Sequence, residues 1–286
     1  MWGEMQRERI TDDIYVFTSE LYAQVTASAI LTSKGAVLFD TLIYPEETRL
    51  IKRFIEGRLG AQVRYIINSH FHADHTTGTC FFEGATVISH ARCRALLDER
   101  GRASLEHART NSPEMREVEL VLPQIVFDGG GLTLYLGNKT LQLWLSPGHS
   151  SDSIVCLAKE DRVLLAADTV IPIPYFVDGS YDDTLASLNQ IRRRTNEFET
   201  IVQGHGEVVL PGEVEEKLES DLHYMTAIRE SVDAALTARS PEQALEVIDI
   251  ESCGKSRILL NGTVQRLHRQ NVMALASLRR ESMQPQ

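Results

Sequence analysis

The sequence predicts a mixed α/β protein in which two layers of β-sheet are covered by helices and followed by a helical C-terminal segment. Short apolar runs typical of strands alternate with amphipathic stretches up to about residue 210. From Gly212 onward the apolar residues recur only at helical spacing. This order favours two packed sheets over a doubly wound parallel sheet. We expect one domain over residues 1–211 and a helical extension over residues 212–286 that packs on or near it.

The first forty residues are predicted to form strands. The β-branched and aromatic runs that predict them lie at 14–19, 25–33 and 36–40. Lys34 and Gly35 suit a hairpin turn between the last two runs. Pro45 begins a predicted helix with apolar residues at helical spacing, and Gly60 suits its C-terminal cap. A short buried strand is expected next, at 63–68.

The middle of the chain contains a second set of predicted strands. A strand at 85–89 and a helix from Ala91 to Arg100 come first, and residues 100–118 are polar and aperiodic, so we expect a long surface loop there. Glycine-containing turns then separate β-type runs at 121–127, 132–137, 141–146, 153–158 and 162–168. The remaining predicted elements are a helix at 184–196, a strand at 200–204 and helices beginning near 214, 241 and 261.

The charge and composition argue against some classes of partner. The 286 residues carry a formal net charge of −11, and the longest basic run is Arg192 to Arg194, so a nucleic-acid partner is not expected. No stretch approaches the roughly 18 apolar residues that a membrane span needs. We therefore expect a small-molecule substrate and no membrane, while the oligomeric state cannot be read from the sequence.

The four cysteines are scattered, without a C-x-x-C pair, which favours a reducing compartment. The N-terminal segment, residues 1–13, has no apolar run typical of a signal peptide. The predicted location is the cytoplasm.

A cluster of metal-binding residue types directly follows the predicted strand at 63–68. His70 and His72 are two residues apart, so both imidazoles can face one ion as the chain leaves the strand. Asp74 and His75 lie just beyond, where Gly78 permits a tight turn, and can serve a second ion. Imidazole and carboxylate together suit zinc, with iron or manganese as alternatives.

Three more candidate ligands stand where predicted strands end: His149, Asp168 and His205. Each alone has a structural explanation, as a turn histidine or a helix-capping aspartate, but the set is typical of a metal site. Glycines flank two of them, at Gly148, Gly204 and Gly206, and allow the backbone to approach an ion closely.

With these residues in place, the chain resembles the metallo-β-lactamase superfamily. The likeness rests on SHFHADHTTG, SPGHSSDS, the aspartate of AADTV and QGHGE, in that order, and spans roughly residues 10–210. It implies a four-layer αββα sandwich with a dinuclear metal site at one edge of the sheets, and a catalytic domain over residues 1–211.

The resemblance also implies a role for each ligand. The first metal would be held by His70, His72 and His149, and the second by Asp74, His75 and His205, with Asp168 bridging both. Asp74 would be the catalytic residue that holds the nucleophile, a metal-bridging hydroxide, and then passes its proton to the leaving group.

Comparison with branches of the superfamily narrows the chemistry. The aspartate at 168 resembles the glyoxalase II, lactonase and phosphodiesterase branches, whereas most zinc β-lactamases place cysteine or serine there. Ile171 stands where acyl-homoserine lactonases often carry tyrosine. The resemblance implies a hydrolase for an acyl bond, whether lactone, ester or thioester, with β-lactams or phosphoesters as side substrates. The alternative is an enzyme like the persulfide dioxygenases, with one iron and three ligands.

Candidate substrate residues are aromatic side chains near these ligands. Phe71 lies between two of the histidines, and a predicted loop at 170–181 carries Tyr175, Phe176 and Tyr181. They line a substrate pocket or cover the core. The helix that contains His223 is a candidate to fold back over the site, and basic residues in the tail, such as Arg266, do not match the glutathione-binding pattern of glyoxalase II.

Overall fold

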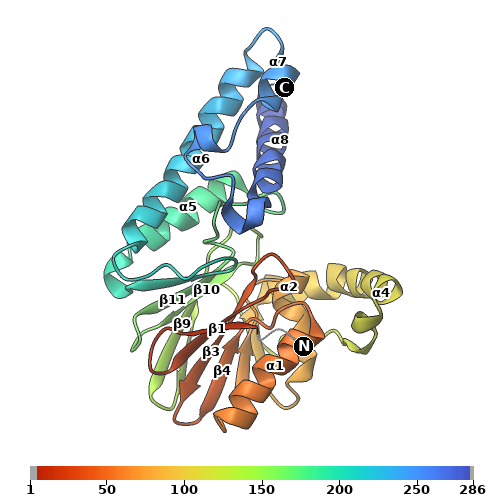
Figure 1. The fold of residues 1–286 in the computed structure, drawn as a ribbon, viewed down its shortest axis with the longest axis vertical. Helices are drawn as coiled ribbons and strands as arrows, with labels where there is room; N and C mark the ends of the chain where they lie inside the picture. The colour runs from red at the N-terminus through yellow and green to blue at the C-terminus, as the bar shows by residue number, and fades with distance from the viewer. Residues whose placement is uncertain (1–4, 284–286) are drawn as a thin grey trace.

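Two β-sheets packed face to face form the centre of the molecule, and helices cover both outer faces. The computed structural model describes residues 5–283, so the first four residues of the N-terminal segment considered above lie outside it. Figure 1 shows the sheets in the lower half, with α1 on one side and α5 on the other, and the C-terminal helices rising above them. The predicted αββα sandwich with a C-terminal helical extension is confirmed.

The first sheet has seven strands that follow one another in chain order. They are β1 Gln6–Arg9, β2 Ile14–Thr18, β3 Thr26–Thr32, β4 Gly35–Phe39, β5 Val63–Ile67, β6 Thr86–His90 and β7 Ile125–Phe127. The first four pair antiparallel, and β4 to β7 pair parallel. Because β4 and β5 are parallel, Asp40 and the histidine cluster leave the sheet at the same edge.

The second sheet has five strands in the order β12-β11-β10-β9-β8. They are β8 Leu132–Leu136, β9 Lys139–Leu145, β10 Ile154–Ala158, β11 Val163–Ala167 and β12 Thr200–Gln203. β11 and β12 are parallel, and β9 runs in the same direction because both β9 and β11 pair antiparallel with β10. The chain segments with His149, Asp168 and His205 therefore leave this sheet at one edge.

The helices lie between and after these strands. In the first half they are α1 Pro45–Lys52, α2 Ala73–Thr76, α3 Ala91–Leu96 and α4 Arg102–Asn111. In the second half they are α5 Tyr181–Arg192, α6 Val214–Leu236, α7 Pro241–Glu246 and α8 Val264–Met283. Shorter helical segments are η1 Arg53–Arg58, η2 Thr77–Phe81, η3 Leu97–Gly101, η4 Pro113–Glu117, η5 Thr195–Glu197, η6 Glu251–Cys253 and η7 Leu259–Gly262.

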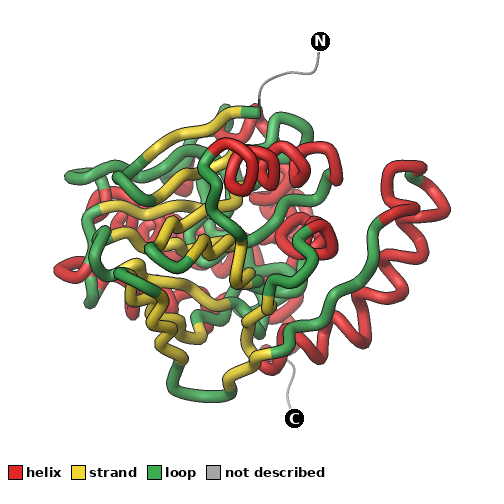
Figure 2. The backbone as a smooth tube through the Cα atoms, turned by 90° about the horizontal axis from the view of Figure 1, so that it is seen from below, coloured by secondary structure: helices red, strands yellow, loops and turns green. Residues whose placement is uncertain are grey.

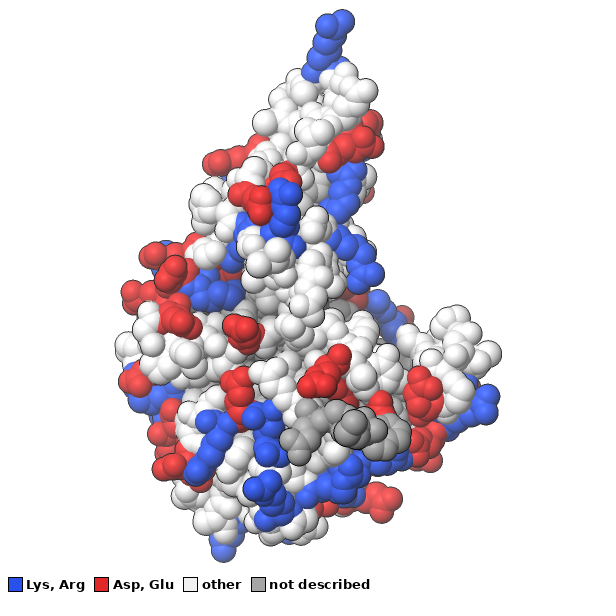
Figure 3. Space-filling view, in the orientation of Figure 1, with Lys and Arg blue, Asp and Glu red and all other residues white. Residues whose placement is uncertain are grey.

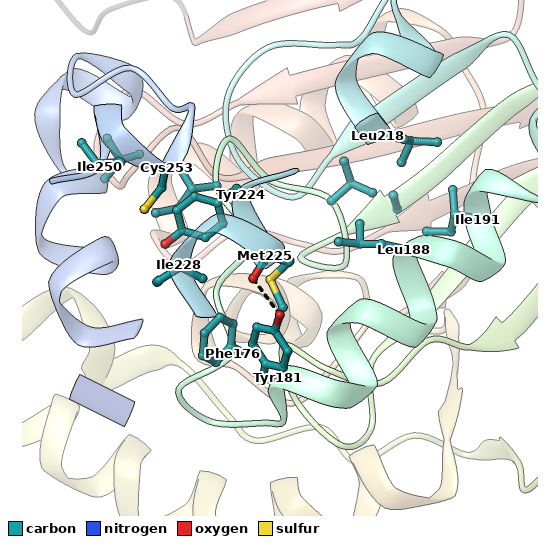
Figure 4. Packing of buried hydrophobic residues seen from close by; sticks show 14 of the residues in the cluster. Phe176, Tyr181, Leu188, Ile191, Leu218, Tyr224, Met225, Ile228, Ile250 and Cys253 are labelled. Carbon is teal, nitrogen blue, oxygen red and sulfur yellow. Dashed lines mark hydrogen bonds between the residues drawn. The ribbon is translucent and has the colours of Figure 1, made fainter. Parts of the chain in front are cut away.

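Three apolar clusters hold the layers together. One lies between the sheets and includes Ile30 and Leu165, and a second packs α1 and η1 on the first sheet through Ile51 and Ile55. The third joins the outer face of the second sheet to α5, α6 and the C-terminal helices. Figure 4 shows part of this third cluster, in which the Tyr181 hydroxyl donates to the carbonyl of Met225 at 2.6 Å. The C-terminal helices thus share a core with the second sheet, whereas the division at residue 211 stays a prediction.

Two elements differ from the expectation. Residues 100–118 are not a loop: they form α4 and η4. No side chain of α4 is buried, so its polar composition carried no sign of burial even though its residues are mostly good helix formers. The strand β1 was not predicted either, because the sequence QRER reads as polar, as is common at a protected sheet edge. Among residues 5–283, no helix is long and apolar enough to span a bilayer.

Candidate metal centre

The predicted ligands gather at the edge where the carboxyl ends of several strands meet. His70 lies just past β5, and the short helix α2 begins directly after His72 and carries Asp74 and His75. His149, Asp168 and His205 follow β9, β11 and β12. Ligand atoms within 4.8 Å of one another form two separate groups able to hold a metal ion, and a third set, His70 with His75 and Asp168, links them.

The first group consists of three imidazoles. Nδ1 of His72 lies 3.0 Å from Nε2 of His70 and 3.0 Å from Nε2 of His149. His70 and His149 are buried, and His72 is half-buried at the mouth of the site. This arrangement offers three nitrogen atoms to one point, which is the ligand set of a catalytic zinc site with open positions.

The second group combines one carboxylate with two imidazoles. Oδ2 of Asp74 lies 3.4 Å from Nε2 of His205 and 3.8 Å from Nε2 of His75. Asp168 lies between the two groups: its Oδ2 is 3.2 Å from His149 Nε2 and 3.4 Å from His205 Nε2, while Oδ1 is 3.2 Å from His75 Nε2. One carboxylate therefore faces nitrogen atoms of both groups.

Hydrogen bonds on the outer side of the rings fix which nitrogen faces inward. Nδ1 of His75 donates to Asp40 at 2.8 Å. Nδ1 of His149 donates to the Tyr175 carbonyl at 3.0 Å, and Nδ1 of His205 donates to the Ala23 carbonyl at 2.9 Å. His72 is reversed, because its Nε2 donates to Asp178 at 3.0 Å. In the neutral ring each inward nitrogen is then left with a lone pair, the arrangement that metal-bound histidines show.

Unsatisfied atoms at the centre indicate that these residues fit a metal. Among the described residues, the buried atoms His75 Nε2 and Asp168 Oδ1 have no hydrogen-bond partner. They lie 3.2 Å from each other as an ion pair, and neither has a hydrogen bond to another group of the described residues. A divalent ion between them would satisfy both, so the donor set and the buried carboxylates fit a cation.

The pKa values of buried histidines shift in opposite directions in the two groups. Burial lowers the pKa of His149 to about 4 and holds the pKa of His70 well below its usual range, so both rings are neutral at pH 7. Burial opposes the charged form of His205 as well, but Asp168 and Asp74 outweigh it and raise its pKa to about 10. Despite burial, His75 and His205 lower the pKa of Asp74 to about 2. In the absence of a cation, protons on the imidazoles of the second group therefore balance the charges of Asp74 and Asp168.

Glycine allows the close approach of the chain at this edge. A Cβ on Gly204 would lie 1.9 Å from Oδ1 of Asp168, so only glycine leaves room for that carboxylate. Gly78 is also required by packing, because its Cβ would lie 2.3 Å from the Thr41 carbonyl oxygen. It lies in the helical segment η2 rather than in the tight turn that the sequence suggested.

A cavity of about 480 Å³ opens onto the ligands. One wall comes from α8, through Arg266, Leu267 and Gln270, and another from the loop that carries Tyr22. Arg266 is the one arginine or lysine in the described lining of this cavity. The element that folds over the site is therefore α8 and not the helix of His223, whose exposed ring lies against Gly254.

The four candidate substrate residues separate into two pairs. Tyr175 lines the cavity beside the ligands, and Phe71 lines a neighbouring cavity. Phe176 and Tyr181 do not reach either cavity: both are buried in the cluster beneath α5 and α6, the core position that the sequence had left open. The loop at 170–181 thus borders the site with only part of its aromatic side chains.

Several residues around the site were not identified from the sequence. Asp40, Asp178 and Tyr22 support or line the centre, as described above. Asp40 had a readable signal, because it ends the strand next to β5 as an acidic residue in an apolar run. Asp178 lies in the mostly apolar loop at 170–181, where only the aromatic residues are predicted candidates, and Tyr22 lies in a loop that carries no such signal.

The sequence is similar to a known protein family and to individual members of it. A family model described as the metallo-beta-lactamase superfamily matches residues 22–212. The metallo-beta-lactamase type 2 of Bacteroides fragilis is 23% identical over 215 residues, which cover 70% of this chain and 78% of that protein. The human acyl-coenzyme A thioesterase MBLAC2 is 32% identical over 164 residues, covering 51% of this chain and 54% of that protein.

Solved structures share the fold. A metallo-beta-lactamase from Pontibacter korlensis superposes with a TM-score of 0.65 at 18% identity, covering 78% of this chain and 99% of that one. The DIM-1 metallo-beta-lactamase superposes with a TM-score of 0.62 at 17% identity, covering 77% of this chain and 97% of that one. At these identities the likeness shows a common fold.

Proposed function

Because the chain belongs to the metallo-beta-lactamase superfamily, whose fold is metal-dependent, we propose that this hydrolase uses two divalent ions to cleave an acyl bond, preferentially a thioester. The observation that carries the proposal is the position of Asp168, whose two oxygens face nitrogen atoms of both ligand groups. A carboxylate in that place is suited to bridge two ions.

The seven side chains would divide as the sequence predicts. His70, His72 and His149 would hold one ion, Asp74, His75 and His205 the other, and Asp168 both. When bound, such ions polarise the acyl carbonyl and lower the pKa of a coordinated water to about 7. Zinc is the metal we propose, with iron or manganese as alternatives.

Asp74 is the residue we assign to proton transfer. It lies in the lining of the cavity and is half-buried, and its Oδ2 is 3.4 Å from His205 Nε2. In hydrolysis the carbon–sulfur bond of the thioester breaks, water supplies the hydroxyl of the carboxylic acid, and the remaining proton goes to the leaving thiolate. Asp74 would hold the attacking water by one oxygen and carry that proton.

The preference for a thioester is supported by similarity and by the shape of the site. The human relative is named an acyl-coenzyme A thioesterase, and the match covers about half of this chain and about half of that protein. We take the activity in that name as a guide to the substrate class. The cavity of about 480 Å³ beside the ligands offers room for a leaving group of some length, with Arg266 at its wall. Lactones and simple esters would be alternative substrates.

Elemental analysis beside a substrate panel tests the proposal. We expect two metal ions per chain and turnover of acyl thioesters above lactones, phosphodiesters and β-lactams. One iron per chain with oxygen consumption would instead support a persulfide dioxygenase-like enzyme. Two ions per chain without hydrolysis of any acyl compound would show that the substrate class is wrong.

A further inference from the structure

A second cavity, of about 290 Å³, adjoins the metal centre on the side of helix α4. It meets the first cavity at Ile43, His72 and Ala73, which line both. An acyl group whose carbonyl lies at the ligands would therefore have two directions open to it. The first cavity contains Arg266 and Gln270, whereas the second is mostly apolar.

The inner wall of the second cavity is apolar and well packed. Phe71, Leu97, Met115 and Val118 contribute to it, and all four are buried. Phe71 and Leu97 belong to a small apolar cluster with Cys93 that is separate from the three main clusters. These packing contacts hold the inner wall in place whether or not a ligand occupies the cavity.

The outer wall is a helix that packs on no core. Leu105 and Ala108 of α4 line the cavity, and their spacing of three residues places them on the same face of the helix. Both are half-buried, while no side chain of α4 is buried. Figures 1 and 2 show this segment as an arm that stands beside the sheets, and Figure 3 shows it as a lobe at the right of the molecule. The apolar face of α4 therefore has the cavity as its neighbour.

Two of the three charged side chains in the lining, Arg100 and Asp178, are bound to each other, and the third, Glu119, is exposed. Arg100 donates two hydrogen bonds to Asp178, at 3.1 and 3.2 Å, and its guanidinium lies 4.6 Å from the centre of the Phe71 ring. Asp178 also accepts the hydrogen bond from His72 Nε2. This pairing satisfies both charges and connects the rim to a proposed metal ligand, which leaves an apolar interior for the occupant.

We propose that this cavity, termed the acyl chamber, binds the hydrocarbon part of the substrate's acyl group while the leaving group lies along α8. The inference rests on the proposed function, because it takes the metal centre as the place of the scissile bond. The chamber is near the small end of ligand pockets and too small for a folded partner. Its continuity with the metal centre at His72 and Ala73 favours a part of the substrate over an unrelated ligand.

A series of straight-chain acyl thioesters with one leaving group tests the chamber. For the wild-type protein we expect kcat/KM to rise roughly fourfold for each added methylene until the chamber is full. The variant Ala108→Phe, which fills the chamber, should lose at least about tenfold of kcat/KM for the longer chains relative to acetyl thioester. The matched control is Ala103→Phe, on the same helix but outside the lining, which should keep the wild-type profile.

Binding of 1-octanol to the metal-loaded protein separates this proposal from the proposed function. We expect calorimetry to show octanol binding for the wild-type protein and for Ala103→Phe. Ala108→Phe should lose that binding while its thermal midpoint stays unchanged. Thioester hydrolysis with no dependence on chain length would overturn the chamber and leave the proposed function intact. Octanol binding that Ala108→Phe abolishes, without hydrolysis of any acyl compound, would support the apolar site and overturn the proposed function. Equal chain-length profiles of kcat/KM and equal octanol binding for Ala108→Phe and Ala103→Phe would overturn the acyl chamber.

Discussion

The ring of His75 donates from Nδ1 to Oδ2 of Asp40 at 2.8 Å, and both side chains are buried. Asp40 also accepts hydrogen bonds from the backbone nitrogen and the hydroxyl of Ser69, the residue before the first histidine of the cluster. One carboxylate thus orients a ring and holds the start of the ligand segment. Removing its charge should affect the metal centre although Asp40 is not itself a proposed ligand.

We expect Asp40→Asn to weaken metal binding about 10- to 100-fold, as changes in residues behind metal ligands commonly do. Asparagine keeps the shape of the side chain and tolerates the left-handed backbone of residue 40, where φ is 60°. Competition with a chelator measures the affinity, and circular dichroism checks the fold. A folded variant with wild-type affinity would show that Asp40 does not support the centre.

The bridging role of Asp168 gives a second prediction. Asp168→Ala should lower the metal content from two ions to one per chain and reduce kcat by more than about 100-fold, beyond the usual effect of a residue behind the ligands. Elemental analysis and steady-state kinetics on the same sample measure both effects. Retention of two ions and of activity would mean that the bridge is assigned to the wrong residue.

Gly204 offers a test of the same carboxylate without altering it. The Cβ of an alanine would lie 1.9 Å from Asp168 Oδ1, so Gly204→Ala should displace the carboxylate and lower the occupancy of the metal centre. The control is Gly57→Ala, where a Cβ meets no atom within 4 Å and helix propensity favours alanine. If metal analysis gives both variants the wild-type content, the carboxylate does not need the room that Gly204 leaves.

The pH dependence of the metal-free protein follows from the second ligand group. The folded-state pKa of His205 is about 10, above its ordinary value of about 6.5, so its contribution to stability is present below pH 6.5 and is lost as pH rises through 10. The folded-state pKa of Asp74 is about 2, below the ordinary value near 3.9, so its contribution is present above that value and is lost as pH falls through 2. Taken alone, these two groups favour the range between about pH 4 and 6.5; because the folded-state pKa of His149 is about 4, His149 removes stability as pH falls below 6.5, so the maximum lies near pH 6.5.

Metal loading should change that profile, because a bound ion displaces protons from the imidazoles and its affinity rises with pH. We expect the thermal midpoint of the metal-free protein to fall between pH 6.5 and 10, and the midpoint of the loaded protein to fall less. Calorimetry with and without a chelator over this range measures the difference. Parallel curves for the two forms would contradict the assignment of His205 to a cation-binding group.

Arg266 on α8 should act on the leaving group. Arg266→Ala is expected to raise KM about tenfold for thioesters with an anionic leaving group, such as coenzyme A or glutathione, since a charge-assisted contact contributes about 1.5–3 kcal/mol. Thioesters of neutral N-acetylcysteamine should be affected little. Arg280→Ala, which removes a charge paired with Glu242, is the control on the same helix. An equal change of KM for both leaving groups would exclude recognition of charge by Arg266.

The sequence predicted those parts of the site that depend on strand ends. Each proposed ligand follows an apolar run whose end is readable, and the contacts of His149, Asp168 and His205 with the first cluster agree with the expected gathering at one edge. The supporting carboxylate of Asp178 was not predictable in this way. It reaches His72 from the irregular loop between β11 and α5 and pairs with Arg100 at the end of the helix predicted over 91–100, a contact between distant segments that no local pattern indicates.

The helix α4 shows why the cavities could not be predicted. Most of its polar residues face solvent, and its apolar residues Leu105 and Ala108 face a cavity, so it gives no burial pattern from which a helix can be recognised. The long amphipathic helix α6 was predicted because Leu218, Met225 and Val232 are buried at regular spacing. An apolar pattern in the sequence indicates side chains that pack against other parts of the protein. Side chains that only line a cavity give no such pattern.

The wall supplied by α8 has a consequence for the order of events during synthesis. All seven proposed ligands precede residue 206, whereas Arg266, Leu267 and Gln270 emerge from the ribosome later. A nascent chain would therefore hold its complete set of ligands while the side of the site that faces α8 is still open to solvent. Metal could enter at that stage by a wide path, and the last helix would then narrow the access that remains for substrate.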